Sequence, residues 1–108
     1  MKTEDRRYIY KILTENEWEQ LNQNQKFLGS PLDLKDGYIH ASFEEQKLII
    51  LEKYFSEITP VYLLKIDPLK LGSDCLVKHE KSVTSQETYP HIYGTLCLDA
   101  VESYEIIN

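Results

Sequence analysis

Arginine, cysteine and long apolar runs are scarce in this sequence, and each shortage excludes a class of protein. The only arginines are Arg6 and Arg7, the other basic residues are scattered lysines, and the formal net charge is −6. A general nucleic-acid binder needs a basic surface that displaces counterions, so this class is excluded. The longest apolar runs cover only residues 48–51 and 61–64, which is far too short for a membrane span. We therefore expect neither general nucleic-acid binding nor a membrane protein.

Cysteine use points to a reducing compartment. Cys75 and Cys97 form no CxxC pair, and no apolar segment typical of a signal peptide follows the charged residues 1–7. Two isolated thiols without an export signal are expected to be reduced and partly buried, in a cytoplasmic protein. The sequence also has no GxGxxG motif and no phosphate-binding P-loop, which excludes the commonest nucleotide-binding folds.

A zinc site is the metal site to consider. The cysteines and the three histidines contain one pair, Cys75 and His79, whose spacing suits a zinc ion. Structural zinc sites need a second such pair, and the sequence has none. We therefore expect no metal site.

The order of predicted elements indicates one α+β domain over residues 1–108, with residues 1–7 as a flexible leader. Capping boxes at Thr14 and Ser42 predict helices over 15–23 and 43–56. The predicted strands are 8–13, 38–43, 61–66, 75–80, 95–98 and 100–107. A polar loop is expected at 81–88. Strands outnumber helices, which favours small mixed or mainly antiparallel sheets with two main helices.

The turn at Asp36-Gly37 and the segment after it carry the first candidate site. If residues 38–43 form a strand, alternation puts Tyr38, His40 and Ser42 on one face. The helix predicted to begin directly after Ser42 would add its N-terminus beneath these side chains. A helix N-terminus favours an anionic or strongly polarised ligand.

A second cluster of similar chemistry lies at residues 89–94. His91 follows Pro90, which restricts the backbone before it to an extended geometry, and Tyr93 precedes Gly94. Two clusters of aromatic and imidazole groups in one small domain predict a single shared pocket. Glu80 is a candidate carboxylate of that pocket.

Each candidate also has a structural interpretation. His40 and His91 could be half-buried histidines whose ring nitrogens bond each other or backbone groups. Ser42 could serve only as a helix N-cap, and Glu80 could be a solvated strand end. The residues alone leave both interpretations open.

Two runs and two further positions together resemble the bacterial family named domain of unknown function 952. The run at 29–42 begins Gly-Ser-Pro-Leu-Asp-Leu and ends Asp-Gly-Tyr-Ile-His-Ala-Ser, and the run at 89–94 reads Tyr-Pro-His-Ile-Tyr-Gly. Residues 10–13 and Glu80 also match. The resemblance extends over residues 8–101, nearly the whole chain.

In fold, that family resembles the ADP-ribosyltransferases and the RNA 2′-phosphotransferases, which bind NAD in a cleft between two small sheets. The resemblance implies an ADP-ribosyltransferase-like fold and NAD as the candidate cofactor. It also implies that His40 lies near the bound ribose or nicotinamide, with Ser42 beside it, and that Glu80 is the candidate catalytic carboxylate. The chain departs from those enzymes at Tyr10, where they carry a ribose-binding histidine, and in having no arginine after Arg7 to hold phosphate.

The resulting hypothesis is a polar pocket that binds a nucleotide-like small molecule such as NAD and transfers or hydrolyses ADP-ribose. The candidate catalytic residues are His40, Glu80 and His91, and the candidate ligand-binding residues are Tyr10, Ser30, Tyr38, Ser42 and Tyr93. The alternative is a catalytically inactive module that binds a ligand or a protein partner. The missing histidine at Tyr10 favours it, and so does the status of Glu80, which is only a candidate for the catalytic glutamate.

Overall fold

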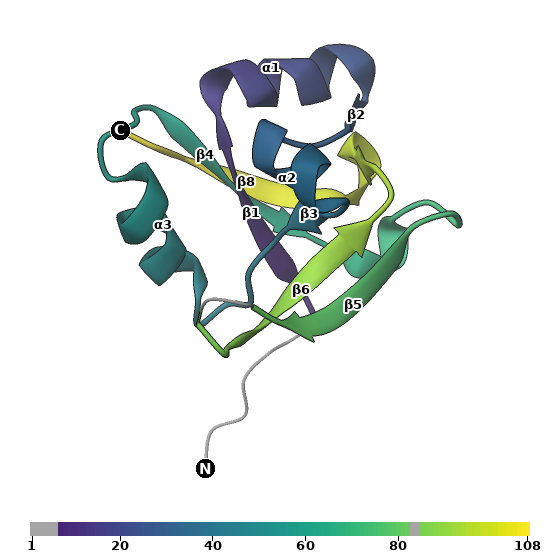
Figure 1. The fold of residues 1–108 in the computed structure, drawn as a ribbon. Coiled ribbons are helices and arrows are strands. Elements are labelled where there is room, and N and C mark those ends of the chain that lie inside the picture. The colour runs from purple at the N-terminus through teal and green to yellow at the C-terminus, as the bar shows by residue number, and fades with distance from the viewer. Residues whose placement is uncertain (1–6, 83–84) are drawn as a thin grey trace.

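The computed structural model describes residues 7–82 and 85–108, which form three small sheets and three α-helices (Figure 1). The strands are β1 (Ile9–Thr14), β2 (Lys26–Phe27), β3 (Ile39–His40), β4 (Val61–Ile66), β5 (Leu76–Lys81), β6 (Thr88–Tyr93), β7 (Leu96–Cys97) and β8 (Val101–Ile107). The helices are α1 (Glu15–Asn24), α2 (Pro31–Asp36) and α3 (Lys47–Phe55), with 3₁₀ turns η1 (Pro68–Lys70) and η2 (Leu98–Ala100).

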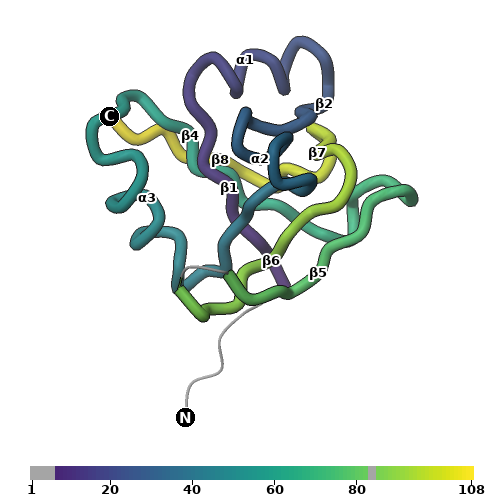
Figure 2. Tube along the Cα trace, in the orientation of Figure 1, coloured from purple at the N-terminus to yellow at the C-terminus, as the bar shows by residue number. Residues whose placement is uncertain are grey.

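All strand pairs in the described residues are antiparallel, so the chain is an α+β protein with small antiparallel sheets. The strand orders are β1-β4-β8, β2-β7 and β3-β6-β5. Figure 2 shows the short β7 beside β2 near the end of α1. A single bridge, Tyr10 to Ser42, joins the first sheet to the segment after β3.

Alternation along β1 and β4 builds a separate core on each face of the β1-β4-β8 sheet. Ile9, Leu13 and Leu64 face the larger core, together with α1 and the β3-β6-β5 sheet. Tyr10 and Leu63 belong to the smaller core, which α3 covers in part. The molecule is therefore layered, with α3 on one face of this sheet and the remaining elements on the other (Figure 1).

Helix α1 follows the sequence prediction closely. The Thr14 hydroxyl accepts from the Glu17 amide, and the Glu17 carboxylate accepts from the Thr14 amide, so the predicted capping box is present. Leu21 is fully buried, and Trp18 stacks on Tyr62 with ring centroids 5.1 Å apart. The positions of β1, β4, β5 and β8 agree with the predicted strands to within one residue at most ends.

The predicted helix over 43–56 is wrong in its start. Helix α3 begins at Lys47, and the capping box expected from Ser42 and Glu45 does not form. The backbone of Ser42 instead pairs with Tyr10, donating at 2.7 Å and accepting at 2.8 Å. This long-range pairing overrides the local capping signal, and it removes the helix N-terminus that was expected beneath His40. Leu48 on α3 is 62% exposed.

The prediction of a strand over 38–43 is also too long, and β6 was not predicted as a strand. Pro90 lies in β6, the central strand of its sheet, and its carbonyl accepts from the Ala41 amide at 3.2 Å. In a strand the N–H and C=O of one residue point to the same neighbour, so the donor that Pro90 lacks would face β3. Regular pairing of β3 with β6 therefore ends at His40.

Two expectations concern residues outside the described ranges. Residues 1–6 of the predicted leader and residues 83–84 of the predicted polar loop are not described. Within the described part of that loop, the Ser82 amide donates to the Glu87 carbonyl at 2.8 Å.

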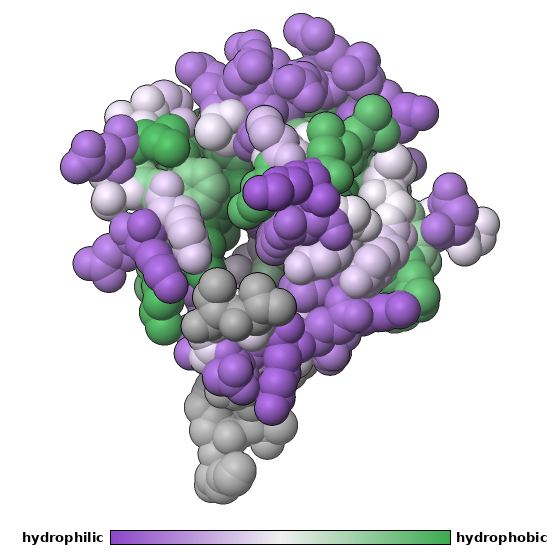
Figure 3. Space-filling model, viewed as in Figure 1, coloured by the Kyte–Doolittle hydropathy of each residue, from purple (hydrophilic) through white to green (hydrophobic). Residues whose placement is uncertain are grey.

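The surface is mixed in polarity. On the face seen in Figure 3, apolar groups gather over α3 and beside α2, separated by polar side chains. Among the described helices, none combines the length and apolar character that a membrane crossing requires.

Candidate functional site

Two histidines from distant parts of the chain lie opposite each other on neighbouring strands. β3 and β6 pair with His40 directly across from His91, and the two ring centroids are 5.8 Å apart. Directly opposed residues of an antiparallel pair have side chains on the same face. The sheet therefore joins the two clusters that the sequence singles out.

Tyr38 lies at the centre of this group. Its ring stacks on His91 with centroids 4.0 Å apart and planes 19° apart, and it lies 4.7 Å from the His40 ring and 5.4 Å from the Tyr93 ring. Burial raises the pKa of Tyr38, and three nearby carboxylates raise it further, so its phenol stays protonated. The group, called the histidine cluster below, consists of Tyr38, His40, Glu80, His91 and Tyr93.

Helix α2 supplies a buried carboxylate beneath His40. Pro31 at its first position and a capping box between Ser30 and Asp33 start this helix, which was not predicted; only the turn at Asp36-Gly37 was. Proline is favoured at the first helical position because its missing N–H has no partner there. The capping box turns Asp33 inward, and its side chain is 2% exposed.

Four donors satisfy the two oxygens of Asp33. Oδ2 accepts from Lys11 Nζ at 3.0 Å and from the Ser30 amide at 2.9 Å, and Oδ1 accepts from the His40 amide at 3.1 Å and meets His40 Nδ1 at 2.6 Å. Burial alone would raise the pKa of Asp33. The hydrogen bond from His40, the Lys11 ammonium and the two amides outweigh burial, so the pKa lies well below its usual range.

His40 is held between two carboxylates. Its Nδ1 meets Asp33, and its Nε2 lies 3.0 Å from Oδ2 of Asp36, one helical turn earlier in the sequence. Carboxylate oxygens accept and do not donate when ionised, so the doubly protonated imidazolium is the ring form that donates to both. The His40 side chain is 31% exposed, whereas its partner Asp33 is enclosed.

A second carboxylate–histidine pair lies on β5 and β6. His91 Nδ1 lies 2.8 Å from Oε1 of Glu80, and the Tyr93 hydroxyl donates to the same oxygen at 2.6 Å. The hydrogen bond from Tyr93, followed by that from His91, lowers the pKa of Glu80. The hydrogen bond between Tyr93 and Glu80 also raises the pKa of Tyr93, to about 12. Glu80 is therefore a carboxylate, and Tyr93 a neutral phenol, at neutral pH.

The other three predicted site residues lie outside the cluster. Ser30 caps α2 and contacts Asp33, so it acts on the cluster only through that residue. Tyr10 and Ser42 pair with each other, and Tyr10 packs in the smaller core with Lys47 Nζ 4.3 Å from its ring centroid. The alternation expected for Tyr38 and His40 is present, but Ser42 is 6% exposed and engaged in the bridge.

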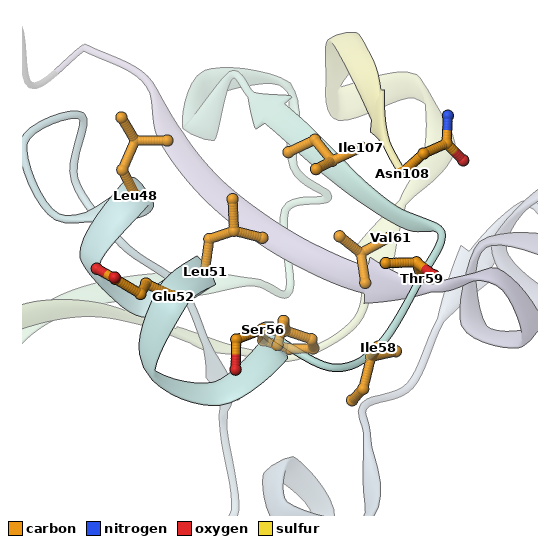
Figure 4. A pocket seen from close by; sticks show the side chains of 10 residues that line it. Leu48, Leu51, Glu52, Ser56, Ile58, Thr59, Val61, Ile107 and Asn108 are labelled. Atoms are coloured by element: carbon orange, nitrogen blue, oxygen red, sulfur yellow. The ribbon is translucent and has the colours of Figure 1, made fainter.

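Two surface hollows flank α3, and neither contains a residue of the histidine cluster. The first, of about 330 Å³, is apolar and lies between α3 and the ends of β4 and β8; Leu51, Val61 and Ile107 line it (Figure 4). The second, of about 510 Å³, is lined by polar groups that include Tyr10 and Lys47. The histidine cluster is instead a surface cluster, in which Glu80 and His40 are partly exposed.

No group of three or more His, Cys, Asp or Glu side chains is placed to hold an ion in the described ranges. Cys75 and Cys97 are free and half-buried, as the sequence predicts.

The sequence analysis missed Asp33, Asp36 and Lys11. Two local signals point to the acidic pair, since Ser30-Pro31-x-Asp33 is a helix start and Asp36 precedes His40 by four residues. Lys11 carries no such signal, because its contact with Asp33 depends on β1 packing beneath α2.

Comparison with known proteins identifies the family. Residues 12–104 match the family model described as Protein of unknown function (DUF952). The chain is similar to the crystal structure of protein CC0527 from Caulobacter crescentus, with TM-score 0.83, 34% identity, and coverage of 94% of this chain and 86% of that one. The solution structure of the same protein gives TM-score 0.74 at 34% identity, with 91% and 82% covered. No curated protein matches the chain. Since the family model covers most of the sequence, the chain belongs to the DUF952 family.

Proposed function

We propose that this chain is a bacterial, cytoplasmic protein whose histidine cluster binds a nucleotide-like small molecule such as NAD and cleaves its nicotinamide–ribose bond. The observation that carries the proposal is the arrangement of Glu80. Both of its described hydrogen bonds go to Oε1, and the side chain is 38% exposed. A fixed carboxylate with its second oxygen toward solvent is suited to a ligand that bears or develops positive charge.

NAD develops such a positive charge when it is cleaved. When its nicotinamide–ribose bond breaks, the bonding electron pair leaves with the nicotinamide nitrogen and an oxocarbenium-like centre forms at ribose C1′. A carboxylate stabilises that centre, as in glycoside hydrolysis. Attack by water then gives ADP-ribose and releases a proton, and attack by another nucleophile gives a transferred ADP-ribose. We assign to Oε2 of Glu80 the stabilisation of this oxocarbenium-like centre, and to His40 a hydrogen bond to a ribose hydroxyl.

The aromatic side chains fit the planar part of the ligand. The Tyr38 and Tyr93 rings lie 5.4 Å apart at an interplanar angle of 48°, and a nicotinamide or purine ring can stack on either. Tyr38 is also half-buried against His91, so little side-chain entropy is lost when a ligand packs on it. We further propose that the sheets have the ADP-ribosyltransferase-like arrangement, on the likeness of residues 38–42 to the strand those enzymes use.

A catalytically inactive binding module is the second candidate, and the place of Tyr10 favours it. Tyr10 stands where the transferases carry a ribose-binding histidine, and its ring packs in the smaller core against Lys47. His40 alone would then bind the ribose hydroxyls. A module of this kind would bind the ligand through Tyr38 and His40 without cleaving it.

Ligand-observed NMR of the purified protein tests the proposal. NAD, ADP-ribose, nicotinamide and mononucleotides are added to the wild type, to His40→Ala and to His79→Ala. His79 is the matched control, because it is an exposed histidine of the same sheet that contacts Phe43 and lies outside the cluster. Saturable binding that is lost in His40→Ala and kept in His79→Ala is expected. No binding by the wild type to any compound, or equal binding by both variants, would contradict it.

Turnover separates the two candidates. NAD is incubated with the wild type and with Glu80→Gln, and released nicotinamide is measured. Release that depends on Glu80 supports the enzyme, whereas binding of NAD without release by the wild type supports the inactive module.

A further inference from the structure

We infer that each of the two carboxylate–histidine pairs, Asp33–His40 and Glu80–His91, combines an exposed group that contacts the ligand with a buried residue that positions this group. His40 and Glu80 are the ligand-facing groups. Asp33 and His91 are positioning residues that act through them. The identity of the ligand rests on the function proposed above, but the assignment of the four side chains rests on their own geometry.

The two pairs are reciprocal in burial. In the first pair the carboxylate of Asp33 is 2% exposed and the imidazole of His40 is 31% exposed. In the second pair the imidazole of His91 is 5% exposed and the carboxylate of Glu80 is 38% exposed. Each pair therefore presents one member to solvent, and the two exposed members are of opposite chemical type.

The buried member fixes the protonation of the exposed one. Asp33 stays ionised, because the donors around it together lower its pKa by more than burial raises it. Its Oδ1 lies 2.6 Å from His40 Nδ1, so the proton on that nitrogen is held in place. The Nε2 edge of His40 then faces outward, and its contact with Asp36, a side chain 35% exposed, can be exchanged for a ligand.

The second pair is fixed in the same way with the roles exchanged. Nδ1 of His91 donates to Oε1 of Glu80, and the Tyr93 hydroxyl donates to the same atom. Tyr38 stacked on the face of His91 keeps that ring from turning. Both fixed donors engage Oε1, so Oε2 of Glu80 is the acceptor presented outward.

The cluster thus presents His40 Nε2 from β3 and the carboxylate oxygen Glu80 Oε2 from β5, the strands on either side of β6, where His91 stacks on the Tyr38 ring. A ligand lying on Tyr38 meets both. Holding an acid and a carboxylate at fixed positions is the usual way in which general acid–base sites are built. Positioning residues behind such groups fix the tautomer and the ring orientation, as the carboxylates behind metal-bound histidines do.

NMR of the imidazole nitrogens in the ligand-free protein at pH 7 tests the assignment directly. The wild type should show a proton on Nδ1 of His40 and a proton on Nδ1 of His91. Asp33→Asn should change the nitrogen shifts of His40 and leave those of His91, whereas Glu80→Gln should do the reverse. His79, which lies outside both pairs, is the internal reference in every spectrum.

Loss of the Asp33 charge leaves Lys11 without its carboxylate, so Asp33→Asn could unfold. The double variant Lys11→Met/Asp33→Asn removes both buried charges and keeps the shape of the site. An unprotonated Nδ1 in either His40 or His91 of the wild type would overturn the inference, whether or not a variant folds. Unchanged His40 shifts in both Asp33 variants would also overturn it.

A second measurement connects positioning to binding. If NAD binds, Asp33→Asn should weaken it about tenfold, at the lower end of the effect of positioning residues at metal sites, and add nothing to the loss caused by His40→Ala. Additive losses would overturn the inference. If NAD does not bind and the ring shifts still follow their carboxylates, the proposed function fails while the assignment of the two pairs stands.

Discussion

The buried ion pair between Lys11 and Asp33 gives the sharpest test of the structure. The Lys11 and Asp33 side chains are 10% and 2% exposed, and the charged atoms lie 3.0 Å apart. Asp33→Ala removes the carboxylate and leaves the Lys11 ammonium buried without its partner, which costs about 3–5 kcal/mol when one member of a buried pair is lost. A domain of this size has about 5–15 kcal/mol of stability in total. The Asp33→Ala variant should therefore have lost a large part of its free energy of unfolding.

Lys11→Met is the informative comparison, because Asp33 keeps its other three donors. The Ser30 amide, the His40 amide and His40 Nδ1 still satisfy the carboxylate, so the expected cost is about 1–3 kcal/mol. Adding Lys11→Met to Asp33→Ala removes the unpaired charge as well. The double variant should therefore be more stable than Asp33→Ala alone, although it carries one more substitution.

Urea denaturation at pH 7 measures these differences, provided that the slope with denaturant is the same for all variants. Asp36→Ala is the control, because it removes a carboxylate of the same helix from an exposed contact with His40, and exposed pairs contribute at most about 1 kcal/mol. If Asp33→Ala costs no more than Asp36→Ala, or if Lys11→Met does not rescue it, the account of the buried pair is wrong.

Two further predictions concern acid stability and a glycine. Because the pKa of Asp33 is lowered in the folded state, its contribution is complete above the ordinary value of about 4 and is lost as the pH falls below it. The difference in unfolding free energy between wild type and Asp33→Asn should thus shrink from pH 4 to pH 2, and a constant difference in urea titrations would refute it. Gly94 has φ +132°, and a Cβ there would lie 2.7 Å from Cys75 Sγ, whereas Gly37 at φ +87° has open space. Thermal unfolding should show a loss of about 2–4 kcal/mol for Gly94→Ala but only about 1 kcal/mol for Gly37→Ala, and equal losses would contradict the close approach.

The parts of the fold that the sequence predicts are those with local causes. The capping box at Thr14 and the β-branched and aromatic residues of β1 operate within a few residues, and the helix and strand that they predict are present. The capping box at Ser42 has the same local signal and does not form, because the Ser42 backbone pairs with Tyr10. That pairing depends on two segments far apart in sequence, and local propensity cannot reveal it. β6 was missed because Pro90 normally argues against a central strand.

The candidate site was predictable to a similar extent. Alternation placed Tyr38 and His40 together, and similar chemistry in two clusters suggested that His91 and Tyr93 would join them, which the β3–β6 pairing explains. The prediction that Tyr10 and Ser42 share a pocket with them assumed one continuous strand and a helix directly after it. Neither forms, so these two residues belong to the other face of the β1-β4-β8 sheet. Asp33 was missed because no helix was predicted before the turn at Asp36-Gly37.

The cluster owes its order to two local features of α2 and one long-range strand pairing. The capping box of α2 turns Asp33 inward, the left-handed Gly37 ends that helix and lets the chain enter β3, and β6 places His91 opposite His40. The apolar residues of the paired strands, such as Ile39 and Ile92, form part of the larger core, which does not need these particular polar residues. Aspartate, histidine and glutamate at these positions lose conformational freedom and hydration when they are fixed. A structural role requires only that each buried group be satisfied, and it gives no reason for a partly exposed carboxylate and a partly exposed imidazole to be held on the two strands that flank β6. That pairing of fixed, exposed and chemically opposite groups is the property we assign to ligand recognition.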